Sequence, residues 1–135
     1  MELQQDLERV ANYLKTSSDF DIGAFNQLTE DAGALVALRV LARFCLSAED
    51  SLKAIETAIE EDHSENAWKA CHKLTGSCEL IGLKAFGQRS RKLSSDIRAM
   101  PELHLHGDEL NKYIREGRHL IEKIETNFPR LKSYL

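Results

Sequence analysis

The sequence contains little of what interrupts helices, with two Pro and seven Gly among 135 residues. Its three cysteines, Cys45, Cys71 and Cys78, are odd in number and form no CxxC pair, so we expect small buried hydrophobic side chains rather than disulfides or thiolate metal ligands. No apolar run approaches the roughly 18 to 20 residues of a transmembrane helix, and residues 1–5 lack a signal-peptide core. We therefore expect a cytoplasmic protein that does not insert into a membrane.

An excess of basic residues is also lacking. Lys and Arg number 18 against 22 Asp and Glu, which gives a formal net charge of −4 at pH 7. Domains that bind phosphate backbones are usually basic, so this balance argues against nucleic acid as a partner. The length fits a single domain, 1–135, with one hydrophobic core.

What the sequence does contain is apolar residues at helical spacing. Steps of three and four residues place them on one face of each segment, and no convincing polar/apolar alternation occurs, so we predict an all-α fold. Short connections favour an antiparallel up-down four-helix bundle with an additional N-terminal helix. The four apolar faces are Leu38, Leu41, Cys45, Ala48, Leu52, Ile55 and Ile59; Ala67, Cys71, Leu74, Cys78 and Ile81; Leu83, Phe86, Ser90, Leu93 and Ile97; and Leu110, Ile114, Gly117, Ile121, Ile124 and Phe128.

The predicted boundaries assign residues 20–128 to the bundle, whereas residues 1–19 form either a helical extension or a linker. The longest helix should run over about residues 33–62. Ser64 is a natural N-cap for the following helix, and Gly82 should end that helix at its C′ position.

Two Glu-x-x-His segments, residues 60–63 and 116–119, match the spacing found in di-metal carboxylate bundles, where these side chains point into the core. At about 100° per residue, Glu116 and His119 lie roughly 120° and 180° from the middle of the last apolar face. Both should therefore face solvent, and we expect no metal site in this protein.

His72 differs from the other histidines because it projects from the outer face of a helix, roughly 160 to 180° from the apolar face. Gly76 lies beside it one turn later, although glycine inside a helix costs about 1 kcal/mol relative to alanine. A missing side chain there would admit a partner's backbone to the imidazole, as protein-to-protein group transfer requires. Lys69 and Lys73, within a turn, could meet the charge of a phosphorylated ring.

An exposed imidazole is a competent nucleophile toward phosphorus, since an ordinary pKa of about 6.5 leaves it largely neutral at pH 7. Spacing alone leaves a second interpretation open, in which His72 and its lysines form only a solvated helix face.

The run Ala70-Cys71-His72-Lys73-Leu74-Thr75-Gly76-Ser77, followed by Leu80-Ile81-Gly82, resembles the signature of histidine-containing phosphotransfer (HPt) domains. The resemblance covers about residues 20–127 and implies a four-helix bundle with an additional N-terminal helix. It makes His72 the phosphorylated residue, Gly76 the small residue that admits the partner, and Lys73 a favourable charge. Ser77 of the motif and Lys69 are further supporting candidates.

The chain departs from the family pattern at two positions. The family often has Lys three residues after the histidine, where this chain has Thr75. It often has Gln or Glu near the ring on the following helix, where this chain has Ser94, with Arg98 one turn further on. Lys69, Lys73 or Arg98 would then supply the charge.

The resemblance implies a phosphorelay intermediate, which accepts a phosphoryl group on His72 from a receiver-domain aspartate and passes it to another receiver. The receivers would belong to response regulators or hybrid sensor kinases and would hold Mg²⁺, so we expect no cofactor on this chain. No Gly-rich nucleotide loop is present, so ATP-dependent kinase activity is not expected. We expect a monomer, either free-standing or, with residues 1–19 as linker, the cytoplasmic C-terminal part of a membrane sensor kinase.

Two alternatives remain open. A degenerate module would dock a receiver without phosphotransfer, and Thr75 keeps this alternative open. The dimerising helical part of a sensor kinase also exposes a helix histidine, but an acidic residue usually follows that histidine and a Pro lies downstream. Lys73, and the lack of Pro up to Met100, argue against this second alternative.

Overall fold

The computed structural model describes residues 2–135, and these residues contain helices and no strand. The helices are α1 (Glu2–Thr16), α2 (Ile22–Ala32), α3 (Ala34–Glu60), α4 (Ser64–Ile81), α5 (Lys84–Ala99) and α6 (Gly107–Asn127), with short 3-10 helices η1 (Leu103–His106) and η2 (Pro129–Tyr134). No helix among these residues is long and apolar enough to span a bilayer.

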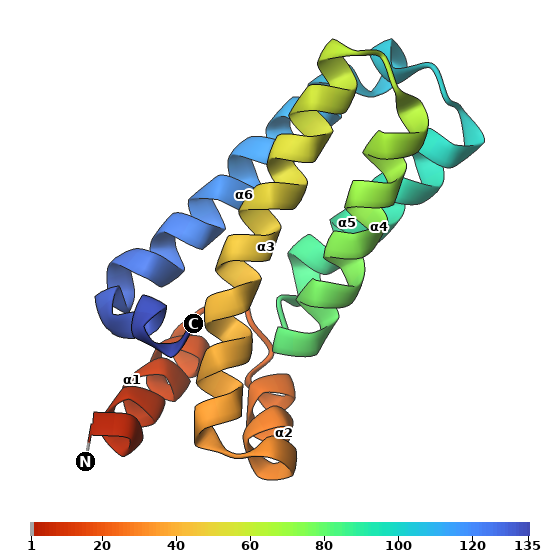
Figure 1. Ribbon diagram of the computed structural model, residues 1–135. Coiled ribbons are helices and arrows are strands. Elements are labelled where there is room, and N and C mark those ends of the chain that lie inside the picture. The colour runs from red at the N-terminus through yellow and green to blue at the C-terminus, as the bar shows by residue number, and fades with distance from the viewer. Residues whose placement is uncertain (1) are drawn as a thin grey trace.

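Helices α3 to α6 run alternately up and down (Figure 1). Helix α4 packs against α3 on one side and α5 on the other, and α6 packs against α3. Helices α1 and α2 cover the end at which α3 begins, and the C-terminal η2 returns to the same end (Figure 1). The predicted all-α fold is confirmed, and the arrangement is consistent with an antiparallel bundle.

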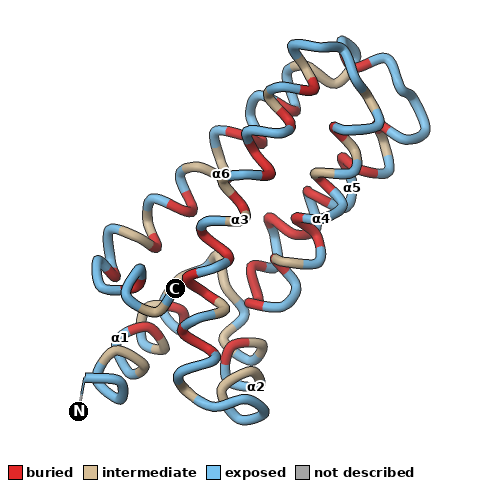
Figure 2. Tube along the Cα trace, in the orientation of Figure 1, coloured by how far each residue is buried: buried red, intermediate tan, exposed pale blue. Residues whose placement is uncertain are grey.

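The core lies along the inward sides of these helices, where buried positions recur at helical spacing (Figure 2). The predicted apolar faces supply most of it, and only Ile59, at the end of the α3 face, is partly exposed. The three cysteines are buried, and burial raises the pKa of each thiol to about 12. Such thiols stay protonated at neutral pH and behave as small hydrophobic groups.

The ends of α4 are well defined. Gly82 ends the helix in the left-handed conformation, with φ of 80°, as its predicted C′ role requires. The backbone N–H of Asp21 donates to the Gly82 carbonyl over 2.7 Å, which ties the start of α2 to the end of α4. The predicted N-cap Ser64 is wrong by one residue: His63 takes that place, because its Nδ1 accepts the N–H of Asn66 over 3.3 Å.

Helix α1 is attached to the C-terminal segment by polar contacts. Arg130 forms ion pairs with Glu2 and Asp6, and the Tyr134 hydroxyl donates to Asp6. Lys123 of α6 reaches Asp19, just after α1, over 3.1 Å. These contacts join residues 2–19 to α6 and η2, at the opposite end of the chain.

Candidate functional site

The middle of α4 holds His72 on the surface. Its neighbours Cys71 and Leu74 point inward and are almost fully buried, so they fix the rotation of the helix. His72 then faces away from the core and is exposed. The position follows from the helical period, since the residue after a core residue turns about 100° away from it.

Gly76, one turn after His72, borders open space. A Cβ built at this glycine would meet no heavy atom within 4 Å, apart from its own helix backbone and chain neighbours. The backbone there is ordinary helix, and no positive φ requires a glycine. Neither packing nor conformation in this structure therefore calls for the missing side chain.

The charges around His72 are of two kinds. Lys69 is paired with Glu65 on the same helix, with 2.9 Å between Nζ and Oε1, and is therefore largely compensated. Lys73 is exposed and has no ion pair or side-chain hydrogen bond within residues 2–135. Lys73 is therefore an uncompensated cation next to the histidine.

The candidate hydroxyls are bound to backbone carbonyls. Thr75 is buried, and its Oγ1 donates to the Cys71 carbonyl over 3.1 Å. Ser94 of α5 is also buried and donates to the Trp68 carbonyl over 3.1 Å. Ser77 donates to the Lys73 carbonyl over 3.2 Å. Exposed positions near His72 are thus occupied by Lys69, Lys73 and Gly76, whereas Thr75 and Ser94 contribute to the packing of α4 and α5.

Trp68 is a residue of this region that sequence analysis missed. It lies four residues before His72, and its half-buried side chain packs against the core. The guanidinium of Arg98 from α5 lies over its ring, with 4.9 Å between Cζ and the ring centroid. The spacing of four residues from His72 was a signal in the sequence, but the contact with Arg98 needed the packing of α5.

The side chains of the two Glu-x-x-His segments lie in different surroundings. His119 is exposed, and Glu116 is paired with Arg89 of α5. His63 caps α4. Within residues 2–135, no three His, Cys, Asp or Glu side chains are grouped closely enough to hold a metal ion.

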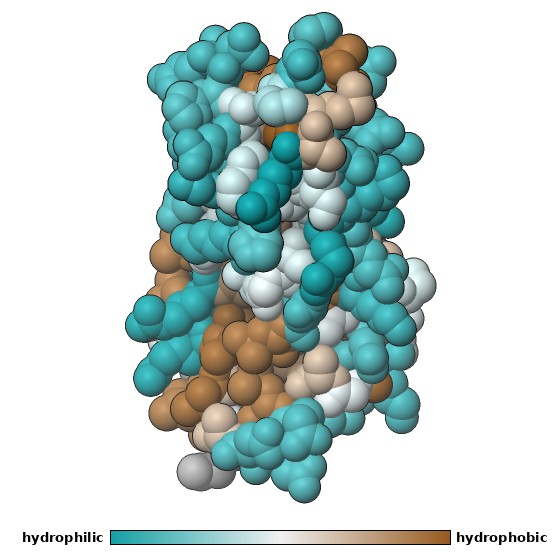
Figure 3. Space-filling view, turned by 90° about the vertical axis from the view of Figure 1, so that its right-hand side faces the viewer, coloured by the Kyte–Doolittle hydropathy of each residue, from teal (hydrophilic) through white to brown (hydrophobic). Residues whose placement is uncertain are grey.

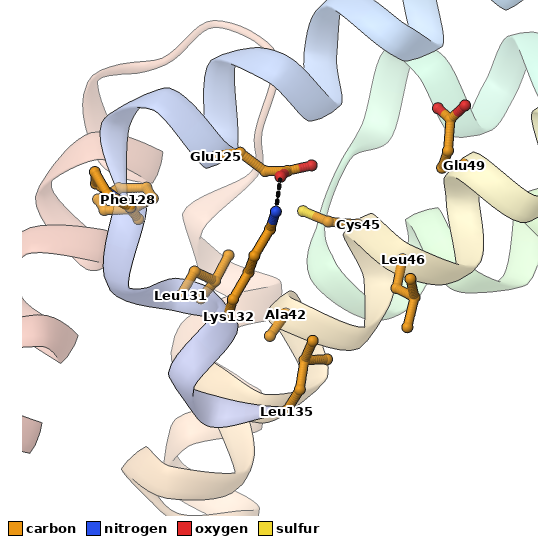
Figure 4. A pocket seen from close by; sticks show the side chains of 10 residues that line it. Ala42, Cys45, Leu46, Glu49, Glu125, Phe128, Leu131, Lys132 and Leu135 are labelled. Atoms are coloured by element: carbon orange, nitrogen blue, oxygen red, sulfur yellow. Dashed lines mark ion pairs between the residues drawn. The ribbon is translucent and has the colours of Figure 1, made fainter.

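A pocket of about 410 Å³ lies elsewhere, between α3 and the C-terminal segment (Figure 4). Its walls include Cys45 and Leu46 of α3, and an ion pair between Lys132 and Glu125, 3.5 Å long, lies beside it. No residue of α4 or α5 lines it. The surface around His72 is therefore not part of this hollow.

Comparison with known proteins gives a family but no individual relative. Searches of curated proteins and of solved structures found no significant match. The family model described as the Hpt domain matches residues 39–116, which include most of α3, all of α4 and α5, and the first half of α6. Because this match covers more than half of the chain and contains His72, the chain belongs to the Hpt domain family, the histidine-containing phosphotransfer domains of two-component phosphorelays.

Proposed function

We propose that this protein is a phosphorelay intermediate in which His72 accepts a phosphoryl group from a receiver-domain aspartate and passes it to another receiver. The observation that carries the proposal is the exposed His72 beside Gly76, whose side is open to a partner. Family membership supports the same reaction.

The reaction is a direct transfer between two proteins. A ring nitrogen of His72 attacks the phosphorus, a nitrogen–phosphorus bond forms, and the bond from phosphorus to the aspartyl oxygen breaks. The receiver's aspartate leaves as a carboxylate, and the reverse reaction with a second receiver releases the histidine. Catalysis of such a step consists mostly of positioning and charge neutralisation.

The residues of this chain have separate roles in the proposal. Gly76 lets the partner's backbone approach the ring, and Lys73 stabilises the transferred charge. Lys69 contributes less because Glu65 compensates it. Mg²⁺ belongs to the receiver, and the chain acts without a cofactor of its own. Thr75, Ser77 and Ser94 act indirectly, through hydrogen bonds that hold the local backbone.

The test is a transfer assay with a panel of receiver domains carrying a labelled phosphoryl group. We expect label on the wild type and none on His72→Gln. His119→Gln is a matched control because His119 is also an exposed histidine on a bundle helix, and it should be labelled normally. Label that never reaches the wild type, or that reaches His72→Gln equally, would contradict the proposal.

One alternative is a docking module without transfer, which the burial of Thr75 favours because this position offers no charge to a phosphoryl group. It predicts saturable binding of a receiver without any labelling. Sedimentation equilibrium at micromolar concentration tests the remaining alternative, because a dimerising kinase segment should sediment at twice the mass expected for the monomer.

A further inference from the structure

Trp68 and Arg98 form a contact between α4 and α5 next to His72. Trp68 is the single tryptophan of the chain. The guanidinium of Arg98 lies within the distance at which a cation is attracted to an aromatic face, which is about 6 Å from the ring centroid. The hydrogen bond from Ser94, one turn before Arg98, to the Trp68 carbonyl fixes α5 against α4 at this level. The guanidinium is therefore held in place rather than freely extended.

Among residues 2–135, Arg98 also has no anionic partner, unlike most cations on these two helices. Lys69, Arg89, Arg91 and Lys92 each form an ion pair with a carboxylate. Within residues 2–135, the cations of α4 and α5 without such a pair are Lys73, Lys84 and Arg98. Lys84 begins α5, at the end of the helix remote from Arg98. The remaining unpaired charges are Lys73, which follows His72 in the sequence, and Arg98, which lies over the ring of Trp68 one turn before His72.

These two charges lie on opposite flanks of His72. At about 100° per residue, Lys73 lies about 100° from His72 around the axis of α4. Trp68, whose ring contacts Arg98, lies about 40° from His72 in the opposite direction. A partner that reaches His72 therefore meets a guanidinium on the α5 side. An unpaired, pre-positioned cation beside a half-buried aromatic ring suits binding of a carboxylate on a protein surface.

We propose that the Trp68–Arg98 pair is a docking site for the acidic surface of the receiver, separate from the residue that carries the phosphoryl group. This inference rests on the proposed relay function. Trp68 is a positioning residue, because it acts by holding Arg98. The pair contributes to binding of the receiver and not to the chemical step at His72.

The experiment measures phosphoryl transfer from a receiver that labels the wild-type chain, as a function of receiver concentration. Arg98→Gln should raise the half-saturating concentration about fivefold, as expected for one exposed charge contact, and leave the limiting rate within about twofold. Trp68→Leu should also raise the half-saturating concentration. Arg98→Lys should raise it less than Arg98→Gln does, because Lys keeps the charge but not the planar stacking. The difference between wild type and Arg98→Gln should shrink as salt is added.

Lys92→Gln is the matched control, because Lys92 is an exposed cation on α5 that is already paired with Asp96. It should leave the half-saturating concentration unchanged.

Trp68 also allows binding to be measured without transfer, since it is the sole tryptophan. In a His72→Gln background, its fluorescence should change saturably with the receiver, and Arg98→Gln should require about five times more receiver.

The outcomes separate the two proposals. Absence of transfer from every receiver to the wild type would overturn the relay function and this inference with it. Normal transfer to the wild type, together with equal half-saturation for wild type and Arg98→Gln, would overturn the docking role alone. A fall in the limiting rate without a shift in half-saturation would place Arg98 in the chemical step, and would also contradict the inference.

Discussion

At the scale of single residues, the candidate site depends on one ring and one absent side chain. His72 is exposed because core residues on either side of it fix the rotation of α4. Gly76 lies in ordinary helical backbone with open space beside it, so its presence weakens the helix without relieving any clash. The geometry is best explained by access from outside the chain.

This explanation gives a prediction in which stability and transfer change in opposite directions. Gly76→Arg should raise the free energy of unfolding by about 0.5–1 kcal/mol, because Arg is a better helix former, while it slows phosphoryl transfer by blocking the partner. Gly76→Ala is the control: it should stabilise the helix similarly and impair transfer much less. Urea unfolding and the transfer assay measure the two effects, and an unchanged transfer rate in Gly76→Arg would contradict the close-approach explanation.

At the scale of helices, the C-terminus of α4 shows a different use of glycine. A Cβ on Gly82 would lie 2.3 Å from the Asp21 carbonyl oxygen and 3.0 Å from the Ala24 Cβ. The left-handed φ of 80° disfavours any other residue as well. Gly82 therefore allows α2 to pack against the end of α4, and this contact helps to fix the axial position of the helix that carries His72.

Gly82→Ala should consequently lower the free energy of unfolding by about 2–4 kcal/mol, from left-handed strain and overlap with α2 together. Gly107→Ala provides the comparison, because Gly107 has a helical φ and open space, and this change should be neutral or slightly stabilising. Denaturant unfolding of both variants tests the difference. Equal stability of the two would show that the contact between α2 and α4 does not constrain position 82.

At the scale of the whole molecule, the two ends of the chain meet around Asp6. Its side chain is only 13% exposed, and hydrogen bonding from the Tyr134 hydroxyl, together with the charge of Arg130, holds its pKa below the ordinary value. Hydrophobic residues gather at this same end of the protein, which is the lower half of the face shown in Figure 3. The ionised Asp6 is therefore a link between α1 and the C-terminal segment.

A carboxyl group whose pKa is lower in the folded state stabilises the fold above its unfolded pKa, and the contribution disappears as pH falls through the folded pKa. Asp6→Asn should therefore cost about 1 kcal/mol at pH 7, and the difference from wild type should begin to shrink below about pH 4 and disappear once the pH is below the lowered pKa of the folded state. Glu8→Gln, on the same helix but without an ion pair to the C-terminal segment, should have little effect at either pH. A pH-independent loss in Asp6→Asn would exclude the ionised carboxylate as its cause.

Much of the fold could be predicted from the sequence because helical packing leaves a period that is readable in one dimension. The four apolar faces, the all-α class and the end of α4 at Gly82 follow from spacing and residue type. The N-cap of α4 could not be predicted in this way. Serine and histidine side chains can both accept a hydrogen bond from a free backbone N–H at the start of a helix, and only the local conformation selects His63.

By itself, the sequence determined that position 72 faces outward on a helix and that position 76 lacks a side chain, because the rotation of a helix follows from its own residues. Only the tertiary structure decided which other helix lies beside that face. It placed Arg98 on the Trp68 ring and, among the described residues 2–135, left this cation without a carboxylate partner, while the Ser94 hydroxyl donates to a backbone carbonyl. The reason is that contacts between helices depend on their relative rotation and axial position, which residues distant in the chain set together.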